Sequence, residues 1–121
     1  FSINGDLEEL RFGLGKHLRI NRAEGIATIL VKEAVLPRAG RKRLGQRHRI
    51  VAATARQYGA EVYDLDGHLN DPRIDSTGFL WWDTAHLTSY GQAVAARWLA
   101  PKLAASIRRS TPVRAPSAGR P

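Results

Sequence analysis

The chain has 121 residues, of which 43% are hydrophobic and 25% are charged, and it contains no cysteine and no methionine. This length predicts one globular domain, the lack of cysteine excludes disulfides and thiolate metal sites, and no stretch approaches the roughly 20 apolar residues of a transmembrane helix. The net charge of +8 includes a basic run from Arg38 to Arg49, which suits a binding module for nucleic acid or an anionic surface. Because basic residues are spread along the whole chain, we expect a solvated face there and no nucleic-acid partner.

The first half of the sequence predicts a helix, a strand and a second helix. Asp6 and Glu9 resemble a capping box, so the first helix is expected to begin at Asp6, and Gly25 is expected to end it. Residues 26–36 (IATILVKEAVL) open with a short apolar run rich in β-branched side chains, which predicts a buried strand. The second helix is expected over residues 42–58, with Gly59 closing it.

The second half predicts a strand, a long loop and a last helix. The strand is expected over residues 60–65 and the loop over residues 66–82, which contain two Gly and one Pro. The last helix is expected to run from Ser89 to Ile107 with Thr88 as its N-cap, and Pro101 should kink it or end its first segment. Residues 109–121 are rich in Pro, Ser and Arg and predict a disordered tail.

Asp83 and His86 lie between the last expected strand and the last expected helix. In open parallel sheets, functional groups gather in loops beyond the carboxyl ends of strands. A spacing of three residues can bring a carboxylate beside an imidazole, so that Asp83 fixes the tautomer and His86 presents its other nitrogen as a base. The pair predicts two thirds of a nucleophilic triad, and a plain surface hydrogen bond is the structural alternative. Trp81 and Trp82 could wall an acyl pocket or pack the loop against the last helix.

A longer pattern, Asp-x-x-His-Leu-Thr-x-x-Gly-x-x-x-x-Ala, is formed by Asp83, His86, Leu87, Thr88, Gly91 and Ala96. It is similar to the last block of the SGNH/GDSL hydrolase family, and the resemblance covers about residues 26–108. The resemblance implies that residues 1–108 are the C-terminal portion of such a domain, with an α/β fold. That fold is part of a three-layer α/β/α, flavodoxin-like sandwich with parallel strands. Two strands are too few for such a sheet, so the others are expected from a missing N-terminal half or from a second chain.

The resemblance also implies an activity, that of a serine ester hydrolase of the esterase or lipase type, or a related O-acyltransferase. Asp83 and His86 would be its catalytic residues, its substrate a small-molecule, carbohydrate or lipid ester, and no metal or organic cofactor would be needed. The chain has no Gly-Asp-Ser block, and neither Ser76 nor Ser89 sits in a strained nucleophile turn, so the serine is expected from elsewhere. A periplasmic or extracellular location is slightly favoured by the resemblance. A catalytically inactive SGNH-like scaffold is the third reading, beside the enzyme and the basic binding module.

The remaining polar candidates are expected to be structural. Asn4 could be an oxyanion donor, but helix capping is the favoured role. His68 and its neighbouring aspartates could form a metal cluster, although a polar loop supplies such residues anyway. His17 and His48 lie in helical, Arg-rich surroundings and are expected to face solvent.

Overall fold

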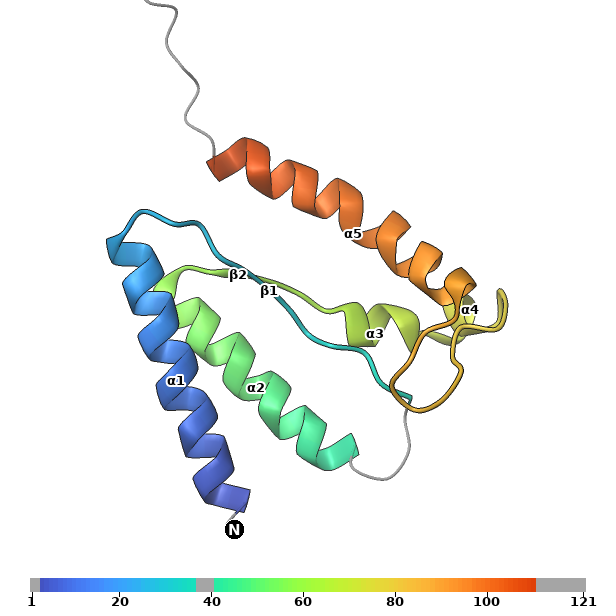
Figure 1. Cartoon of the computed structure of the whole chain (residues 1–121), viewed down its shortest axis with the longest axis horizontal. Helices are drawn as coiled ribbons and strands as arrows, with labels where there is room; N and C mark the ends of the chain where they lie inside the picture. Colours follow the sequence, from blue (N-terminus) through green and yellow to red (C-terminus); the bar gives the residue numbers. More distant parts are fainter. Residues whose placement is uncertain (1–2, 37–40, 111–121) are drawn as a thin grey trace, which may run out of the picture.

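The computed structural model describes residues 3–36 and 41–110, with side chains described from Asp6 onward. Its elements are α1 (Ile3–Ala23), β1 (Ile29–Val31), α2 (Arg41–Tyr58), β2 (Glu61–Tyr63), α3 (Leu65–Leu69), α4 (Pro72–Asp75) and α5 (Ser89–Ser110). Figure 1 shows α1 and α2 on one side of the two strands and α5 along the other side. The loop that carries Asp83 and His86 joins α4 to α5.

The predicted three-layer α/β/α sandwich is wrong for the described residues, which are mostly helical and hold only a two-stranded sheet. The strands β1 and β2 are parallel, and only three residues of each are paired, from Ile29 with Glu61 to Val31 with Tyr63. Both strands are therefore shorter than predicted. Lys32 N still donates to the Tyr63 carbonyl of β2, but Val35 N donates to Asp66 and Leu36 N donates to the Thr84 carbonyl, so the end of the predicted strand leaves the sheet.

The ends of α1 and α2 are only partly as predicted. Gly25 and Gly59 follow the two helices with φ of +71° and +70°, the left-handed conformation that glycine adopts without strain, so both predicted stops are confirmed. The predicted start at Asp6 is wrong, since α1 begins at Ile3. The Asp6 carboxylate instead contacts Arg43 and Arg47 of α2, at 3.2 and 3.4 Å.

The predicted loop over residues 66–82 contains two short helices that sequence reasoning missed. Asp64 caps α3 by accepting a hydrogen bond from Gly67 N, and Asp71 caps α4 by accepting one from Arg73 N, both at 2.9 Å. Aspartate is a preferred N-cap because its carboxylate satisfies an otherwise unpaired amide of the first turn. The acidic residues that suggested a loop therefore begin two helices.

The last helix, α5, is longer than predicted. It runs unbroken from Ser89 to Ser110 with Pro101 inside it, so the proline does not end it. The predicted tail begins later than expected, since residues 109 and 110 are helical, and the rest of it, residues 111–121, lies outside the described part of the chain. No helix within residues 3–36 and 41–110 has the length and apolar character to span a bilayer.

The main hydrophobic core lies at the end of the molecule that carries the Asp83 loop. Its buried members come from α3, the loop and α5, and they are Leu69, Leu80, Trp81, Val94 and Ala95. Burial of large apolar side chains is the main stabilising contribution to a small domain. The loop is therefore anchored by its own apolar residues and is not a loose connection.

The C-terminal part of α5 is tied to β2 through Glu61. Its carboxylate lies 2.7 Å from the Arg109 guanidinium and 2.5 Å from the Tyr63 hydroxyl. These hydrogen bonds, that of Tyr63 first and then that of Arg109, lower the pKa of Glu61 from 4.5 to about 2. The ionised carboxylate is thus favoured in the folded chain.

We expect a pH-dependent loss of stability in a Glu61→Gln variant. A lowered pKa contributes stability that is fully present above pH 4.5 and is lost as the pH falls toward 2. The variant should therefore melt about 3 °C below the wild type at pH 7, with the gap closing between pH 4.5 and 2. Thermal unfolding followed by circular dichroism at several pH values measures this gap. The control is Glu9→Gln, on the exposed surface of α1. A melting-temperature difference that stays constant with pH, or one equally large in this control, would contradict the role of Glu61.

Candidate functional site

The side chains of Asp83 and His86 point toward one another. The Nδ1 atom of His86 lies 2.9 Å from Oδ1 and 2.8 Å from Oδ2 of Asp83. The His86 side chain is 78% exposed, and its Nε2 atom has no hydrogen bond or ion pair within the described part of the chain. A carboxylate on Nδ1 favours the tautomer that carries its proton there, which leaves Nε2 as a free proton acceptor facing solvent.

A tight turn holds this pair in place. Asp83 Oδ1 also accepts hydrogen bonds from the backbone amides of Ala85 and His86, each at 2.8 Å. The amide of Ala85, then the His86 ring and the His86 amide, lower the pKa of Asp83. One carboxylate therefore shapes the turn and orients the imidazole, and it stays ionised at neutral pH.

Backbone pairing joins the two sides of the turn like a short hairpin. Trp82 N donates to the His86 carbonyl at 2.8 Å, and Trp81 forms an antiparallel bridge with Leu87. Thr88 N then donates to the Leu80 carbonyl, also at 2.8 Å. The turn is thus fixed on both flanks.

Thr88 and Gly91 dock α5 against this hairpin. The Thr88 hydroxyl accepts a hydrogen bond from Gly91 N at 3.0 Å, which confirms the predicted N-cap, and donates to the Phe79 carbonyl at 2.5 Å. A side chain at Gly91 would overlap the Leu80 carbonyl oxygen, so only glycine allows the helix to approach this closely. The Leu-Thr-x-x-Gly part of the motif therefore has a structural reason: it sets the position of the loop relative to α5.

A cavity of about 600 Å³ opens beside the pair. Its lining consists of Leu36, Asp75, Gly78, Phe79, Leu80, Trp81, Trp82, Asp83 and Thr84. Trp81 is 5% exposed and packs in the core, whereas Trp82 is 71% exposed at the cavity wall. The predicted packing of the loop is confirmed for Trp81, and both tryptophans line the cavity, whereas its use as an acyl pocket stays a prediction. A volume of this size is in the range that holds small molecules.

The rest of a triad is not found among residues 6–36 and 41–110, whose side chains are described. No serine hydroxyl there is hydrogen-bonded to His86, and the Ser76 hydroxyl bonds to the Arg73 carbonyl at 3.4 Å. The side chain of Asn4, the candidate oxyanion donor, lies outside the described residues. The described site is thus an oriented acid and base without a nucleophile.

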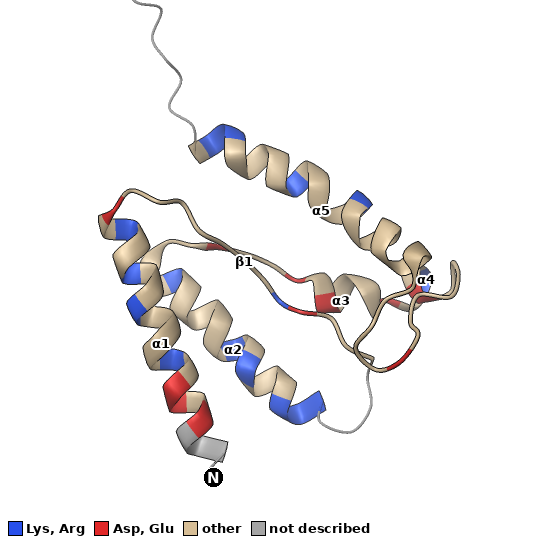
Figure 2. Ribbon diagram, in the orientation of Figure 1, with Lys and Arg blue, Asp and Glu red and all other residues tan. Residues whose placement is uncertain are grey.

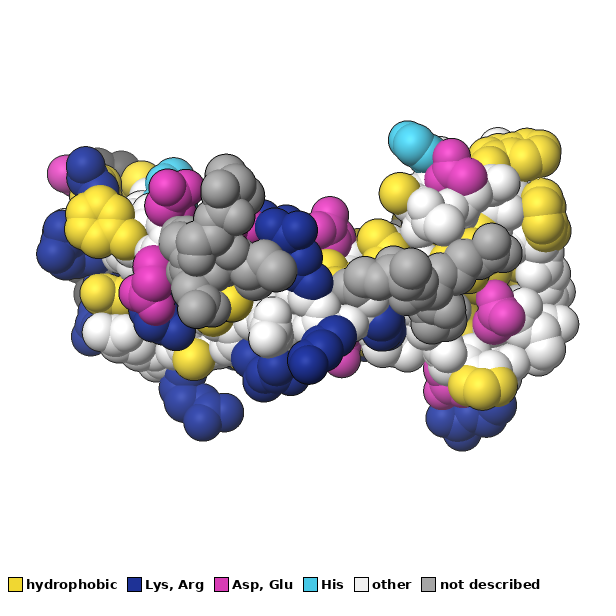
Figure 3. Space-filling model, turned by 90° about the horizontal axis from the view of Figure 1, so that it is seen from below, with side chains coloured by type: hydrophobic (Ala, Val, Ile, Leu, Met, Phe, Trp, Pro, Cys, Tyr) yellow, Lys and Arg dark blue, Asp and Glu magenta, His cyan; other side chains and the backbone are white. Residues whose placement is uncertain are grey.

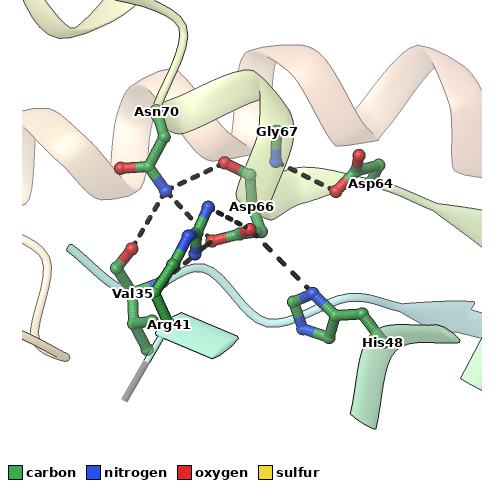
Figure 4. Close-up of polar contacts among 7 residues, drawn as sticks. All are labelled: Val35, Arg41, His48, Asp64, Asp66, Gly67 and Asn70. Atoms are coloured by element: carbon green, nitrogen blue, oxygen red, sulfur yellow. Dashed lines mark hydrogen bonds and ion pairs between the residues drawn. The ribbon is translucent and has the colours of Figure 1, made fainter. Parts of the chain in front are cut away.

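A second polar cluster, which sequence reasoning missed, lies near the ends of both strands and surrounds Asp66 (Figure 4). The Asp66 side chain is 8% exposed and faces the Arg41 guanidinium at 2.7–2.8 Å. Its Oδ1 also accepts hydrogen bonds from Val35 N at 3.3 Å and from the Asn70 amide at 3.0 Å. A carboxylate buried this deeply needs such partners, because an unpaired buried charge is strongly destabilising. The cluster therefore joins the segment after β1 to α2 and α3.

Among the histidines, His48 is not where it was expected. Its side chain is 12% exposed, its Nδ1 lies 3.9 Å from Asp66 Oδ2, and its Nε2 is buried without a partner in the described structure. His17 is exposed, as predicted. His68 stacks on Trp98, with ring centroids 4.7 Å apart, and burial lowers its pKa. No three His, Asp or Glu side chains of the described ranges are grouped so that they could hold a metal ion.

The basic run is partly paired within the chain. Its first residues, 38–40, lie outside the described residues. Arg41 contacts Asp66, while Arg43 and Arg47 contact Asp6. Figure 2 shows the basic residues of α1 and α2 at one end of the molecule, away from the Asp83 loop. Three guanidiniums of the run thus have internal partners, which weakens the interpretation of this run as a nucleic-acid interface.

Comparisons of the chain with protein-family models, with curated proteins and with solved structures found no significant match.

Proposed function

We propose that this chain supplies the acid and the base of a serine ester hydrolase. The observation that carries the proposal is the Asp83 carboxylate on Nδ1 of His86, with the His86 side chain 78% exposed and Asp83 itself lining a cavity. In this proposal His86 is the general base and Asp83 fixes its tautomer and stabilises the imidazolium that forms. The resemblance to the SGNH/GDSL family, which rests on the motif from Asp83 to Ala96, supports the same assignment.

The proposed reaction is acyl transfer from an ester. Nε2 of His86 takes the proton of a serine hydroxyl as the serine oxygen bonds to the ester carbonyl carbon, and it returns the proton to the departing alcohol. Water then attacks the acyl-enzyme by the same proton route and releases the carboxylic acid. An acyltransferase would use another alcohol in place of this water. The serine and the oxyanion donors come, in this proposal, from a missing N-terminal half or from a second chain.

The orientation of His86 can be tested on the chain itself. We expect the neutral ring to carry its proton mainly on Nδ1, because Asp83 accepts from that atom at 2.8–2.9 Å. Long-range proton–nitrogen NMR correlations at about pH 9, where imidazole is neutral, distinguish the two tautomers. In Asp83→Asn, whose amide can donate to Nδ1, the population should shift toward the Nε2 tautomer.

The exposed His17 on α1 is the internal control, because it has no acidic partner in the described structure. It should show the tautomer mixture of a free imidazole and should not respond to Asp83→Asn. A His86 ring whose nitrogen signals match those of His17 would contradict the proposed role of Asp83. The catalytic role of His86 needs a separate activity measurement on the full-length gene product.

A further inference from the structure

The cavity beside the Asp83 loop has aromatic walls and acidic side chains. Phe79 and Trp82 lie at its rim as a perpendicular pair, with ring centroids 5.6 Å apart and planes at 87°. Asp75, the last residue of α4, lines the same cavity, and its carboxylate has no ion pair or hydrogen bond in the described structure. Among the described residues that line the cavity there is no Lys or Arg.

The charge around this cavity is opposite to that of the chain as a whole. The described residues that line it include two Asp, Asp75 and Asp83, a formal charge of −2, whereas the whole chain carries +8. Figure 3 shows hydrophobic and acidic side chains at the right-hand end, with one basic patch at its lower edge, and the other basic side chains over the middle and the left-hand end. An anionic ligand would therefore meet like charge in the cavity, and a cationic ligand would meet opposite charge.

We propose that the cavity lined by Asp75, Trp81 and Trp82 binds a compact organic cation of the quaternary ammonium class. Such cations are recognised by the faces of aromatic rings, whose quadrupoles attract positive charge, and an adjacent carboxylate adds an ion pair. The cavity, at about 600 Å³, has room for such a group together with an attached chain. The inference goes beyond the proposed function, because binding in this cavity needs neither the serine nor turnover.

Three probes of nearly equal shape separate charge from size. They are choline, its neutral carbon analogue 3,3-dimethylbutan-1-ol, and the anion 3,3-dimethylbutanoate. The chain contains three tryptophans, and only Trp81 and Trp82 line the cavity, so their indole N–H signals in a proton–nitrogen NMR spectrum report binding. Trp98 on α5 is the internal reference. We expect choline to shift the two cavity signals with a dissociation constant about threefold or more below that of the alcohol, and the anion to cause no shift.

Two variants with matched controls test which side chains are responsible. Asp75→Asn keeps the shape of the site and should weaken choline binding about threefold, while leaving binding of the alcohol unchanged. Glu9→Gln on α1 removes the same charge far from the cavity and should have no effect. Trp82→Ala should weaken choline binding about fivefold, whereas Phe12→Ala, which removes another exposed aromatic side chain, should not.

Several results would overturn the inference. Equal binding of choline and the neutral alcohol, or no binding of choline, would show that the cavity does not select a cation. An effect of Asp75→Asn no larger than that of Glu9→Gln would remove the carboxylate from the site. These results would leave the proposed hydrolase function untouched, because the tautomer of His86 and ester turnover are measured separately.

Discussion

Replacing His86 by alanine is expected to lower kcat/KM for ester hydrolysis by about 10,000-fold, with KM little changed. The imidazole is the only proposed group that moves the proton, and its ring is hydrogen-bonded only to Asp83 among the described side chains. The variant should fold normally, because the side chain is 78% exposed and substitutions at such sites usually change stability by less than about 0.5 kcal/mol. Hydrolysis of p-nitrophenyl acetate by the full-length product of the gene that encodes this chain measures the effect.

His17→Ala is the matched control for this experiment. His17 is an exposed histidine on α1, so the same substitution there should leave turnover unchanged. The kcat/KM of Asp83→Asn should lie between those of the two alanine variants. We expect a loss of about 100-fold to 10,000-fold, because this variant keeps the base but favours the wrong tautomer of its ring. Unchanged turnover in His86→Ala would reject the catalytic role, whatever the tautomer measurement shows.

The parts of the site that the sequence predicted depend on neighbours in the chain. Asp83 and His86 are three residues apart, and Thr88 caps the helix that follows directly. Gly25 and Gly59 end their helices through a backbone conformation that the residue type alone favours. These features follow from short-range geometry, so one sequence is enough to find them.

The features that the sequence did not predict depend on distant partners. Asp66 bonds to Arg41 and Val35, which are 25 and 31 positions away, and no local pattern marks it as buried. The start of α1 differs from the prediction in the same way. Asp6, the expected cap, forms ion pairs with Arg43 and Arg47 of α2. Local capping competes with tertiary ion pairing, and the sequence does not say which of them prevails.

The number of strands is also a long-range property. An apolar, β-branched run predicts an extended conformation, but pairing requires a neighbour with free backbone groups. Beyond Lys32, whose N still donates to the Tyr63 carbonyl, the chain finds other partners, because Val35 N and Leu36 N bond to a side chain and to the Asp83 loop. The two strands therefore stop after three paired residues, and the expected three-layer sheet is not formed by the described residues.

Replacing Asp66 by alanine is expected to lower the free energy of unfolding by about 3 kcal/mol. The substitution leaves Val35 N and the Asn70 amide without their acceptor in a site where the Asp66 side chain is 8% exposed. Arg41 also loses its partner, but its side chain is 39% exposed and can turn toward water, which holds the cost below that of a fully buried pair. Urea unfolding followed by circular dichroism measures the loss.

Asp64→Ala is the matched control, since Asp64 precedes the same helix and its carboxylate caps it by accepting from Gly67 N, without a hydrogen bond to Arg41, Val35 or Asn70. Removing this N-cap should lower the free energy of unfolding by about 1 kcal/mol.

The two variants should also differ in their effect on the loop that carries His86. Asp66 holds Val35, and the next residue, Leu36, donates from its backbone to the Thr84 carbonyl at 2.9 Å. Asp66→Ala should therefore shift the NMR signals of His86, whereas Asp64→Ala should not. Equal stability losses in the two variants, with unchanged His86 signals, would mean that the buried carboxylate neither stabilises the fold nor positions the loop.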